Sequence, residues 1–249
     1  MRLRLFTAAF FACCLAAGSA RADIYAKPSW QNLMKTMVRF NALDLSDTKL
    51  LDQYAIITEC DLYKAYYNND FKWEEVRHAI VNSIRKNIAT YPIAYQYDTR
   101  LQLDRYDFAS KLFRFTKKST INNINSFDIY SVEGTGCGTA SVTLLPRDFH
   151  AVLADPIYMQ GLPLDEKDAE ALLNQMTKDG NINRIIFVRF NLRIVYIDHM
   201  RKVALPGEVV HYEQSNAPNA SWIRMDARLD SIDFYEDPQM TRLIYEFTL

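Results

Sequence analysis

The sequence predicts an α+β protein, in which an N-terminal helical segment packs on a mainly antiparallel sheet. Two observations predict this class. Apolar residues recur at helical spacing between Pro28 and Tyr91, and from Pro92 onward the period becomes two. Helices that precede strands in this way are typical of α+β proteins. We expect one domain over residues 23–249, with the alternative of a helical subdomain over 28–91 and a β-rich subdomain over 92–249.

Three helical stretches are predicted in the first part of the chain. Ser29 is a suitable N-cap for a helix that runs to about Leu43. A second stretch follows Asp47 and continues, with a break, through Tyr67. The clearest helix lies between residues 70 and 90, because its apolar side chains form one stripe: Trp73, Val76, Ile80, Ile84 and Ile88.

Three short strands and one more helix are predicted next. Thr99–Leu103, Phe127–Glu133 and Thr139–Leu145 have the composition of strands. The run Gly134–Gly138 separates the last two, which predicts a hairpin with a glycine-rich turn. Asp165 is expected to cap a helix that stops by Gly180.

The C-terminal third has the strongest strand pattern. Residues 185–197 form one unbroken apolar face, and the opposite face is polar at its centre: Arg189, Asn191 and Arg193. We expect one side of this strand in the core and the other side in water. A second alternating run starts at Ile223, and its phase changes near Asp230, which predicts a β-bulge. A last strand is expected from Arg242 to Thr248.

Residues 1–22 have the layout of a secretory signal peptide. Arg2 and Arg4 precede an apolar run from Leu5 to Ala17, and small residues follow up to Ala22. The run has 13 residues, whereas a membrane-spanning helix needs about 20. We therefore expect cleavage before Asp23 and a periplasmic or secreted mature chain without a transmembrane segment.

The charge balance argues against a nucleic-acid partner. The full chain has 29 basic and 30 acidic residues, for a net charge of −1. Removal of three leader arginines leaves 26 basic against 30 acidic residues, or −4. Such a chain lacks the basic patch that binding to phosphate backbones requires.

The mature chain keeps two cysteines, Cys60 and Cys137, because Cys13 and Cys14 lie in the leader. Two cysteines in an oxidising compartment favour one disulfide, with two free buried thiols or one reactive thiol as alternatives. Closing a loop of this length would stabilise the fold by about 4 kcal/mol in the chain-entropy model. A lipid anchor at Cys13 is disfavoured, because Phe10-Phe11-Ala12 is a poor lipoprotein signal.

Cys137 is also the candidate nucleophile of a hydrolase, with His150 or His199 as its base. A disulfide would remove its thiolate, so this hypothesis ranks below the structural one. The surrounding Gly134–Gly138 run does not read as a phosphate-binding loop. It lacks the lysine of such loops and precedes a strand composition instead of a helix.

No metal or other cofactor is predicted. Two Glu-x-x-His patterns occur, at Glu75–His78 and Glu208–His211. The second lies in a strand-like segment, where positions three apart point to opposite faces. His78 is expected to pair with Glu74 or Glu75 on a solvated helix face.

Acidic residues cluster in two stretches that could supply a glycosidase carboxylate pair: Asp98, Asp104 and Asp107; Asp226, Asp230, Asp233, Glu236 and Asp237. Charged strand edges and turns are the commoner explanation.

Aromatic residues reach 13%, with 15 tyrosines and 14 phenylalanines. Tyrosine suits both sugar stacking and protein interfaces, so some residues are candidates for a binding face: Tyr95, Tyr97, Tyr63, Tyr66 and Tyr67.

Three stretches, Arg105–Phe108, Leu162–Asp165 and Leu229–Pro238, resemble an uncharacterised family of exported bacterial proteins. The resemblance implies a periplasmic location and assigns no activity, so it lends no catalytic residue. We expect a non-enzymatic domain that binds a protein or cell-envelope partner through its aromatic sheet face or loops. The alternatives are a periplasmic hydrolase, built on Cys137 with a histidine or on a carboxylate pair, and a structural subunit of an envelope complex.

Overall fold

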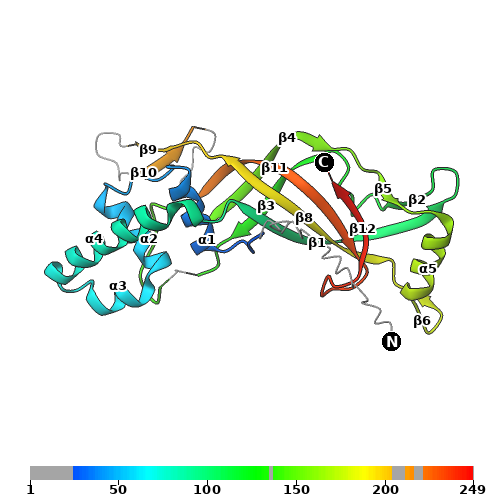
Figure 1. Ribbon diagram of the computed structural model, residues 1–249, viewed down its shortest axis with the longest axis horizontal. Coiled ribbons are helices and arrows are strands. Elements are labelled where there is room, and N and C mark those ends of the chain that lie inside the picture. Colours follow the sequence, from blue (N-terminus) through cyan, green and yellow to red (C-terminus); the bar gives the residue numbers. More distant parts are fainter. Residues whose placement is uncertain (1–24, 135–136, 204–210, 216–220, 249) are drawn as a thin grey trace, which may run out of the picture.

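The computed structural model describes residues 25–134, 137–203, 211–215 and 221–248 (Figure 1). The expected signal peptide, residues 1–22, and Glu208 of the second Glu-x-x-His pattern lie outside the described residues. The predicted α+β class and the mainly antiparallel sheet are confirmed. Figure 1 shows an elongated molecule with helices α1–α4 at one end, α5 at the other and the sheet between them.

The described helices are α1 (Trp30–Arg39), α2 (Thr48–Thr58), α3 (Cys60–Tyr66), α4 (Asp70–Asn87) with a 3₁₀ turn (Ile88–Thr90), and α5 (Glu166–Met176). Their starts follow the predicted capping logic. Ser29 accepts a hydrogen bond from the backbone N–H of Asn32, and Asp165 accepts one from Asp168. The expected break in the second stretch falls at Glu59, between α2 and α3.

The described strands are β1 (Ala94–Asp107), β2 (Leu112–Phe115), β3 (Ile124–Ser131), β4 (Asp148–Ile157), β5 (Gly161–Pro163), β6 (Thr177–Lys178), β7 (Asn181–Ile182), β8 (Ile185–Tyr196), β9 (Met200–Val203), β10 (His211–Gln214), β11 (Trp222–Tyr235) and β12 (Leu243–Thr248). Within the described residues, the main sheet has the order β3-β4-β11-β8-β1-β2-β5. The long β11 pairs in parallel with β4 along its first half and antiparallel with β12 along its second half.

The main sheet curls so that the inner faces of distant strands meet. The ring of Phe127 on β3 lies 4.9 Å from that of Phe190 on β8 and 5.7 Å from that of Tyr97 on β1. One cluster of buried hydrophobic residues joins this inner face to helices α1, α2 and α4. Because the inner face is apolar and buried, polar side chains of the same strands collect on the outer face.

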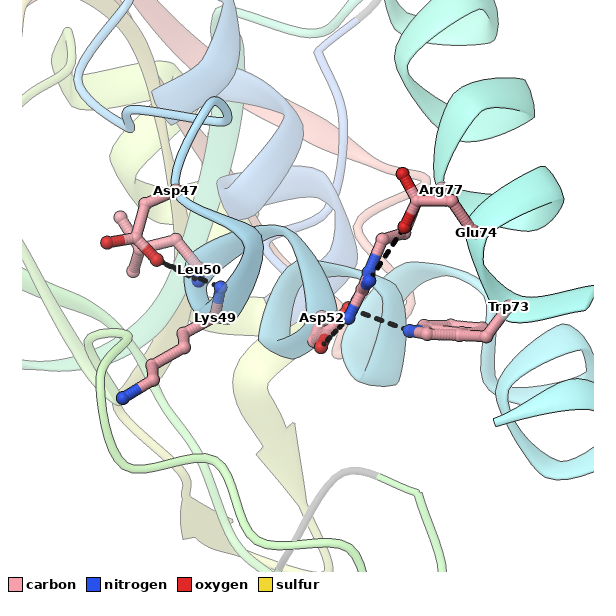
Figure 2. A network of polar contacts seen from close by, with 7 residues as sticks. All are labelled: Asp47, Lys49, Leu50, Asp52, Trp73, Glu74 and Arg77. Atoms are coloured by element: carbon pink, nitrogen blue, oxygen red, sulfur yellow. Dashed lines mark hydrogen bonds and ion pairs between the residues drawn. The ribbon is translucent and has the colours of Figure 1, made fainter. Parts of the chain in front are cut away.

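Polar contacts tie the helical end together and attach it to the strands. Figure 2 shows Asp52 of α2 facing α4, where it accepts hydrogen bonds from Trp73 Nε1 at 2.8 Å and Arg77 Nε at 2.7 Å. The neighbouring N-cap, Asp47, accepts a hydrogen bond from the Tyr212 hydroxyl of β10. This bond is the main reason that the pKa of Asp47 lies below its usual value.

The expected hairpin over residues 127–145 is wrong. β3 pairs with β4, and residues 139–145 form no strand apart from an isolated bridge between Cys137 and Ala140. The physical reason is a side chain: Gln53 Oε1 of α2 accepts the backbone N–H groups of Thr143 and Leu144, at 3.0 and 2.7 Å. A helix therefore satisfies donors that a second strand would otherwise take.

The predicted bulge near Asp230 is confirmed. Leu229 pairs with Leu192 and Ser231 pairs with Asn191, so Asp230 is the extra residue of β11. The expectation that the opposite face of β8 lies in water is only partly right. Asn191 is 7% exposed, and it donates hydrogen bonds of 2.8 Å to Ser231 and Asp233.

Among the described residues, each helix is too short or too polar to span a bilayer.

Candidate functional site

A hollow of about 650 Å³ lies on the outer face of β3, β4 and the start of β11. Its size is within the range of small-molecule binding sites. Most of the residues that line it have polar side chains, and two of them have a phenol or an indole ring: Ser126, Asp128, Tyr130, Ser131, Asp148, His150, Val152, Trp222 and Arg224.

Strand alternation explains why these side chains share one face. On β4, Phe149 and Ala151 are fully buried, which turns Asp148 and His150 outward. On β11, Ile223 and Met225 are buried in the same way, so their neighbours Trp222 and Arg224 point outward and line the hollow. The hollow is thus the polar face of strands whose apolar face builds the core.

The register arranges the hollow in rows across the three strands. One row consists of Asp128, His150 and Arg224. The next row consists of Ser131, Asp148 and Trp222. Directly opposite side chains in a sheet are about 5 Å apart, so each row places its groups within reach of a single ligand.

Contacts within and between the rows orient the side chains. His150 Nδ1 lies 2.6 Å from Asp128 Oδ1, and the Ser131 hydroxyl donates to Asp148. The His150 ring meets the Trp222 ring edge-on, with centroids 5.3 Å apart. Held on two sides, the imidazole is oriented before any ligand arrives.

A buried glutamine fixes the backbone beneath Arg224. Gln214 on β10 is 3% exposed; it accepts the backbone N–H of Arg224 at 2.9 Å and donates to the carbonyl of Arg224 at 3.0 Å. The guanidinium of Arg224 donates from Nε to Asp226 Oδ1 at 2.9 Å. Gln214 of β10 therefore positions the start of β11, which carries Arg224 and Trp222.

The hollow carries more negative than positive charge at neutral pH. Asp128 and Asp148 contribute two carboxylates, and Asp226 balances the only arginine in the lining, Arg224. The Asp128 side chain is 81% exposed and that of His150 is 30% exposed. Open carboxylates beside an aromatic ring suit a ligand that brings hydroxyl or amino donors.

A family model for a domain of unknown function, DUF4852, matches residues 47–175, which is more than half of the chain. The chain belongs to the DUF4852 family. No curated protein and no solved structure matches it. The DUF4852 segment runs from the N-cap of α2 into α5, so it includes β3 and β4 with Asp128 and His150. Trp222 and Arg224 lie beyond it, on β11.

Cys60 and Cys137 also lie in the DUF4852 segment, and the structure joins them by a disulfide. The Sγ atoms of Cys60 and Cys137 are 2.11 Å apart, and the bond links the start of α3 to the loop after β3. Cys137 is 3% exposed. In this structure the cysteine hydrolase hypothesis therefore lacks both a thiol and access for a substrate.

The histidines do not gather. His78 faces Glu74 at 3.2 Å on an exposed part of α4, as predicted. His211 lies 2.7 Å from Glu213 on β10, and His150 belongs to the hollow. In the part of the chain that the structure describes, no group of three or more His, Cys, Asp or Glu side chains could hold a metal ion.

Most acidic candidates pair with cations instead of with each other. Asp98 binds Arg189 at 2.8 Å, and Asp107 binds Arg114 at 2.7 Å; the bond from Arg114 is the first reason that the pKa of Asp107 falls to about 2. Burial raises the pKa of Asp230. Hydrogen bonds from Tyr25 and Arg228 and the charges of two arginines outweigh it, so this pKa lies below its usual value. These ion pairs support the structural explanation for both acidic stretches.

The tyrosine candidates divide between core and surface. Tyr95 is fully buried, whereas Tyr97 is partly buried next to Phe127. On the helices, the rings of Tyr63 and Tyr67 stack with centroids 4.4 Å apart, and Tyr66 is 40% exposed. None of these five tyrosines lines the hollow.

Of the residues that line the hollow, only His150 was predicted from the sequence as a candidate site residue. Residues 148–151 alternate between polar and apolar side chains, a pattern that could have predicted the start of β4. The pairing of β3 with β4 was needed to bring Asp128 beside His150. Only the register makes the candidate site visible.

Proposed function

We propose that this DUF4852 protein is an exported, non-enzymatic binding protein whose hollow takes a glycan of the cell envelope. Cleavage before Asp23 would release the mature chain outside the cytoplasm. The disulfide between Cys60 and Cys137 supports an oxidising compartment.

The row of Ser131, Asp148 and Trp222 beside the row of Asp128, His150 and Arg224 carries the proposal. A sugar ring has an apolar face that packs on an indole and an edge of hydroxyl groups. Carboxylates accept from those hydroxyls, and a guanidinium donates to their oxygens. Both kinds of group lie on adjacent strands in the hollow, so one glycan can meet them together.

Binding without hydrolysis fits the exposure of the carboxylates. A glycosidase keeps its general acid in an apolar pocket, which holds the proton at neutral pH. The Asp128 side chain is 81% exposed and pairs with His150, so the hollow gives it no such enclosure. Release of reducing ends from a glycan by the purified protein would contradict this part of the proposal.

Intrinsic fluorescence provides the test, because Trp30 and Trp73 are buried and Trp222 lies in the hollow. We expect chitotetraose or cellotetraose to change the emission of the mature protein in a saturable way. Trp222→Ala should weaken binding at least about tenfold, measured by calorimetry, since aromatic packing contributes on the order of 1.5 kcal/mol. Asp128→Asn should weaken it less.

The matched control is Tyr196→Ala. Tyr196 is 50% exposed on the neighbouring strand β8 and lies outside the hollow, so its loss should leave glycan affinity unchanged. Failure of both tetrasaccharides to bind at millimolar concentration would overturn the glycan assignment. Recovery of the protein from cytoplasm with its N-terminus intact and its thiols reduced would overturn export.

A further inference from the structure

A second cavity, of about 1060 Å³, lies where β4 and β12 separate along β11. β11 pairs with β4 up to Ala227 and with β12 from Ser231, so residues 228–230 have no ladder partner in either strand. Figure 1 shows the end of β12, marked C, beside β4. The cavity lies in the fork between these strands and shares no lining residue with the glycan hollow.

Apolar side chains form much of its wall. Tyr158 is 78% exposed and Val195 is 49% exposed, and both line the cavity together with Pro156 and Phe247. Single exposed apolar side chains are ordinary on a protein surface, but several that converge on one cavity indicate a binding site.

Two oppositely charged side chains in the lining, Arg228 and Asp155, have polar atoms without a hydrogen-bond partner among the described residues. Arg228 donates from Nε to Asp230 Oδ1 at 2.9 Å, and its side chain is 65% exposed. Its two terminal nitrogens have no hydrogen-bond partner among the described residues. Asp155, on the β4 wall, is exposed and likewise has no hydrogen-bond or ion-pair partner among the described residues. It lies two residues beyond Leu153, the last β4 residue in register with β11.

We propose that this cavity binds a short apolar peptide in its zwitterionic form, a function beyond glycan binding. The peptide carboxylate meets the two terminal nitrogens of Arg228, which match its geometry. The peptide amino group meets Asp155, and the apolar side chains cover Tyr158 and Val195. The volume, about 1060 Å³, lies just above the usual range for small-ligand sites, about 300–1,000 Å³, so the cavity accommodates a tripeptide.

A fatty acid shares the carboxylate and the apolar body, but it lacks an amino group. Its anion would lie in a cavity where Asp155 has no cation to meet, and a like charge in the lining disfavours binding. The presence of Asp155 therefore favours the peptide over the fatty acid.

Calorimetry with three forms of one peptide tests the proposal on the mature chain. The probes are Val-Ala-Phe with free ends, its C-terminal amide and its N-acetyl derivative. We expect the free peptide to bind at least about tenfold more tightly than either blocked form, because each block removes a charge-assisted hydrogen bond. Equal affinities for the three forms, or tighter binding of decanoate, would overturn the proposal.

Variants then assign each charge. Arg228→Gln should abolish the preference for the free acid over the amide, and Asp155→Asn should abolish the preference for the free amine over the N-acetyl form. Arg105→Gln, an exposed arginine on β1 outside the cavity, is the matched control and should change neither preference. Preferences that survive Arg228→Gln and Asp155→Asn would show that the peptide binds elsewhere.

Ala154→Trp provides a check that keeps every charge. Ala154 is exposed and lines the cavity, so an indole at this position fills it without disturbing the core. We expect peptide binding to be lost while chitotetraose still binds in the glycan hollow. Unchanged peptide affinity in this variant would place the site outside the fork. Trp222→Ala should weaken glycan binding and leave peptide affinity unchanged. The glycan proposal and the peptide proposal can therefore fail separately.

Discussion

The outer face of the sheet has two halves that differ in how their polar groups are satisfied. Over β8 and the second half of β11, most charged groups pair with each other, and Tyr25 and Met240 contact some of them from outside these strands. Arg189 binds Asp98 at 2.8 Å, and the ring of Tyr235 lies 5.6 Å from its guanidinium. Over β3, β4 and the start of β11, Asp128 is 81% exposed at the edge of a hollow. We refer to these regions as the covered half and the open half.

The difference comes from what lies on each half. Tyr25, at the start of the described chain, donates to Asp230 in the covered half at 2.9 Å, and Met240 Sδ lies 3.2 Å from Arg189 Nη2. Charges taken out of water must be paired, and this half pairs them. The open half retains groups that water or a ligand can satisfy. Polar alternation in a strand therefore marks an outer face without saying whether that face is available.

The largest expected effect is loss of a charge from the covered half. The Asp230 side chain is 15% exposed and binds Arg193 at 2.9 Å, Arg228 at 2.9 Å and the Tyr25 hydroxyl. Asp230→Ala leaves Arg193 without this carboxylate, so we expect the free energy of unfolding to fall by about 2–3 kcal/mol, reduced from a fully buried pair by partial exposure. Urea denaturation measures it.

Asp128→Ala in the open half is the comparison for this variant. Its pair with His150 is solvated, so the expected loss is at most about 0.5 kcal/mol. Equal losses in the two variants would show that the halves do not differ in the way described.

A smaller effect is expected at Asn191, the buried amide of the covered half. It donates to Ser231 and Asp233, both at 2.8 Å. Asn191→Ala should cost about 1–2 kcal/mol, because the two acceptors lose a neutral donor but no charge becomes unpaired. Thermal denaturation of this variant and of Asp230→Ala compares the two losses of stability. A larger loss for Asn191→Ala would show that hydrogen bonding matters more than charge pairing in this half.

The smallest effect concerns pH. The pKa of Asp230 is lower in the folded chain than in an unfolded one, where it is about 3.9, so the folded state holds fewer protons near that pH. Its contribution to stability is complete above about pH 4 and is lost as the pH falls through the folded pKa. As the pH is lowered from 6 to 3, the urea midpoint of unfolding should therefore fall less steeply for Asp230→Asn than for the unchanged protein. Parallel pH profiles would contradict this coupling.

Local patterns predicted much of the fold. The capping residues Ser29 and Asp165 start helices because their side chains bond to the first free N–H groups, which depends on a few adjacent residues. The bulge at Asp230 follows from a change of phase within one strand. The division into one domain or two stays a prediction.

Pairing was the part that local patterns could not predict. The glycine-rich run predicted a hairpin between neighbours, but Gln53 on a distant helix takes the donors of residues 143 and 144, and β3 pairs with β4. The candidate site depends on this choice. Asp128 and His150 meet only because their strands are adjacent, and Trp222 joins them through a parallel pairing from 74 residues further along the chain than Asp148.

The amino-acid sequence by itself determined the class, the ends of several helices, the bulge and the two cysteines available for a bond, since each follows from periodicity, capping or composition over short distances. Tertiary structure alone decided which strands lie side by side, which polar face is covered and which stays open. Those outcomes depend on competition among distant segments for the same backbone donors and the same surface, and no local pattern contains that competition.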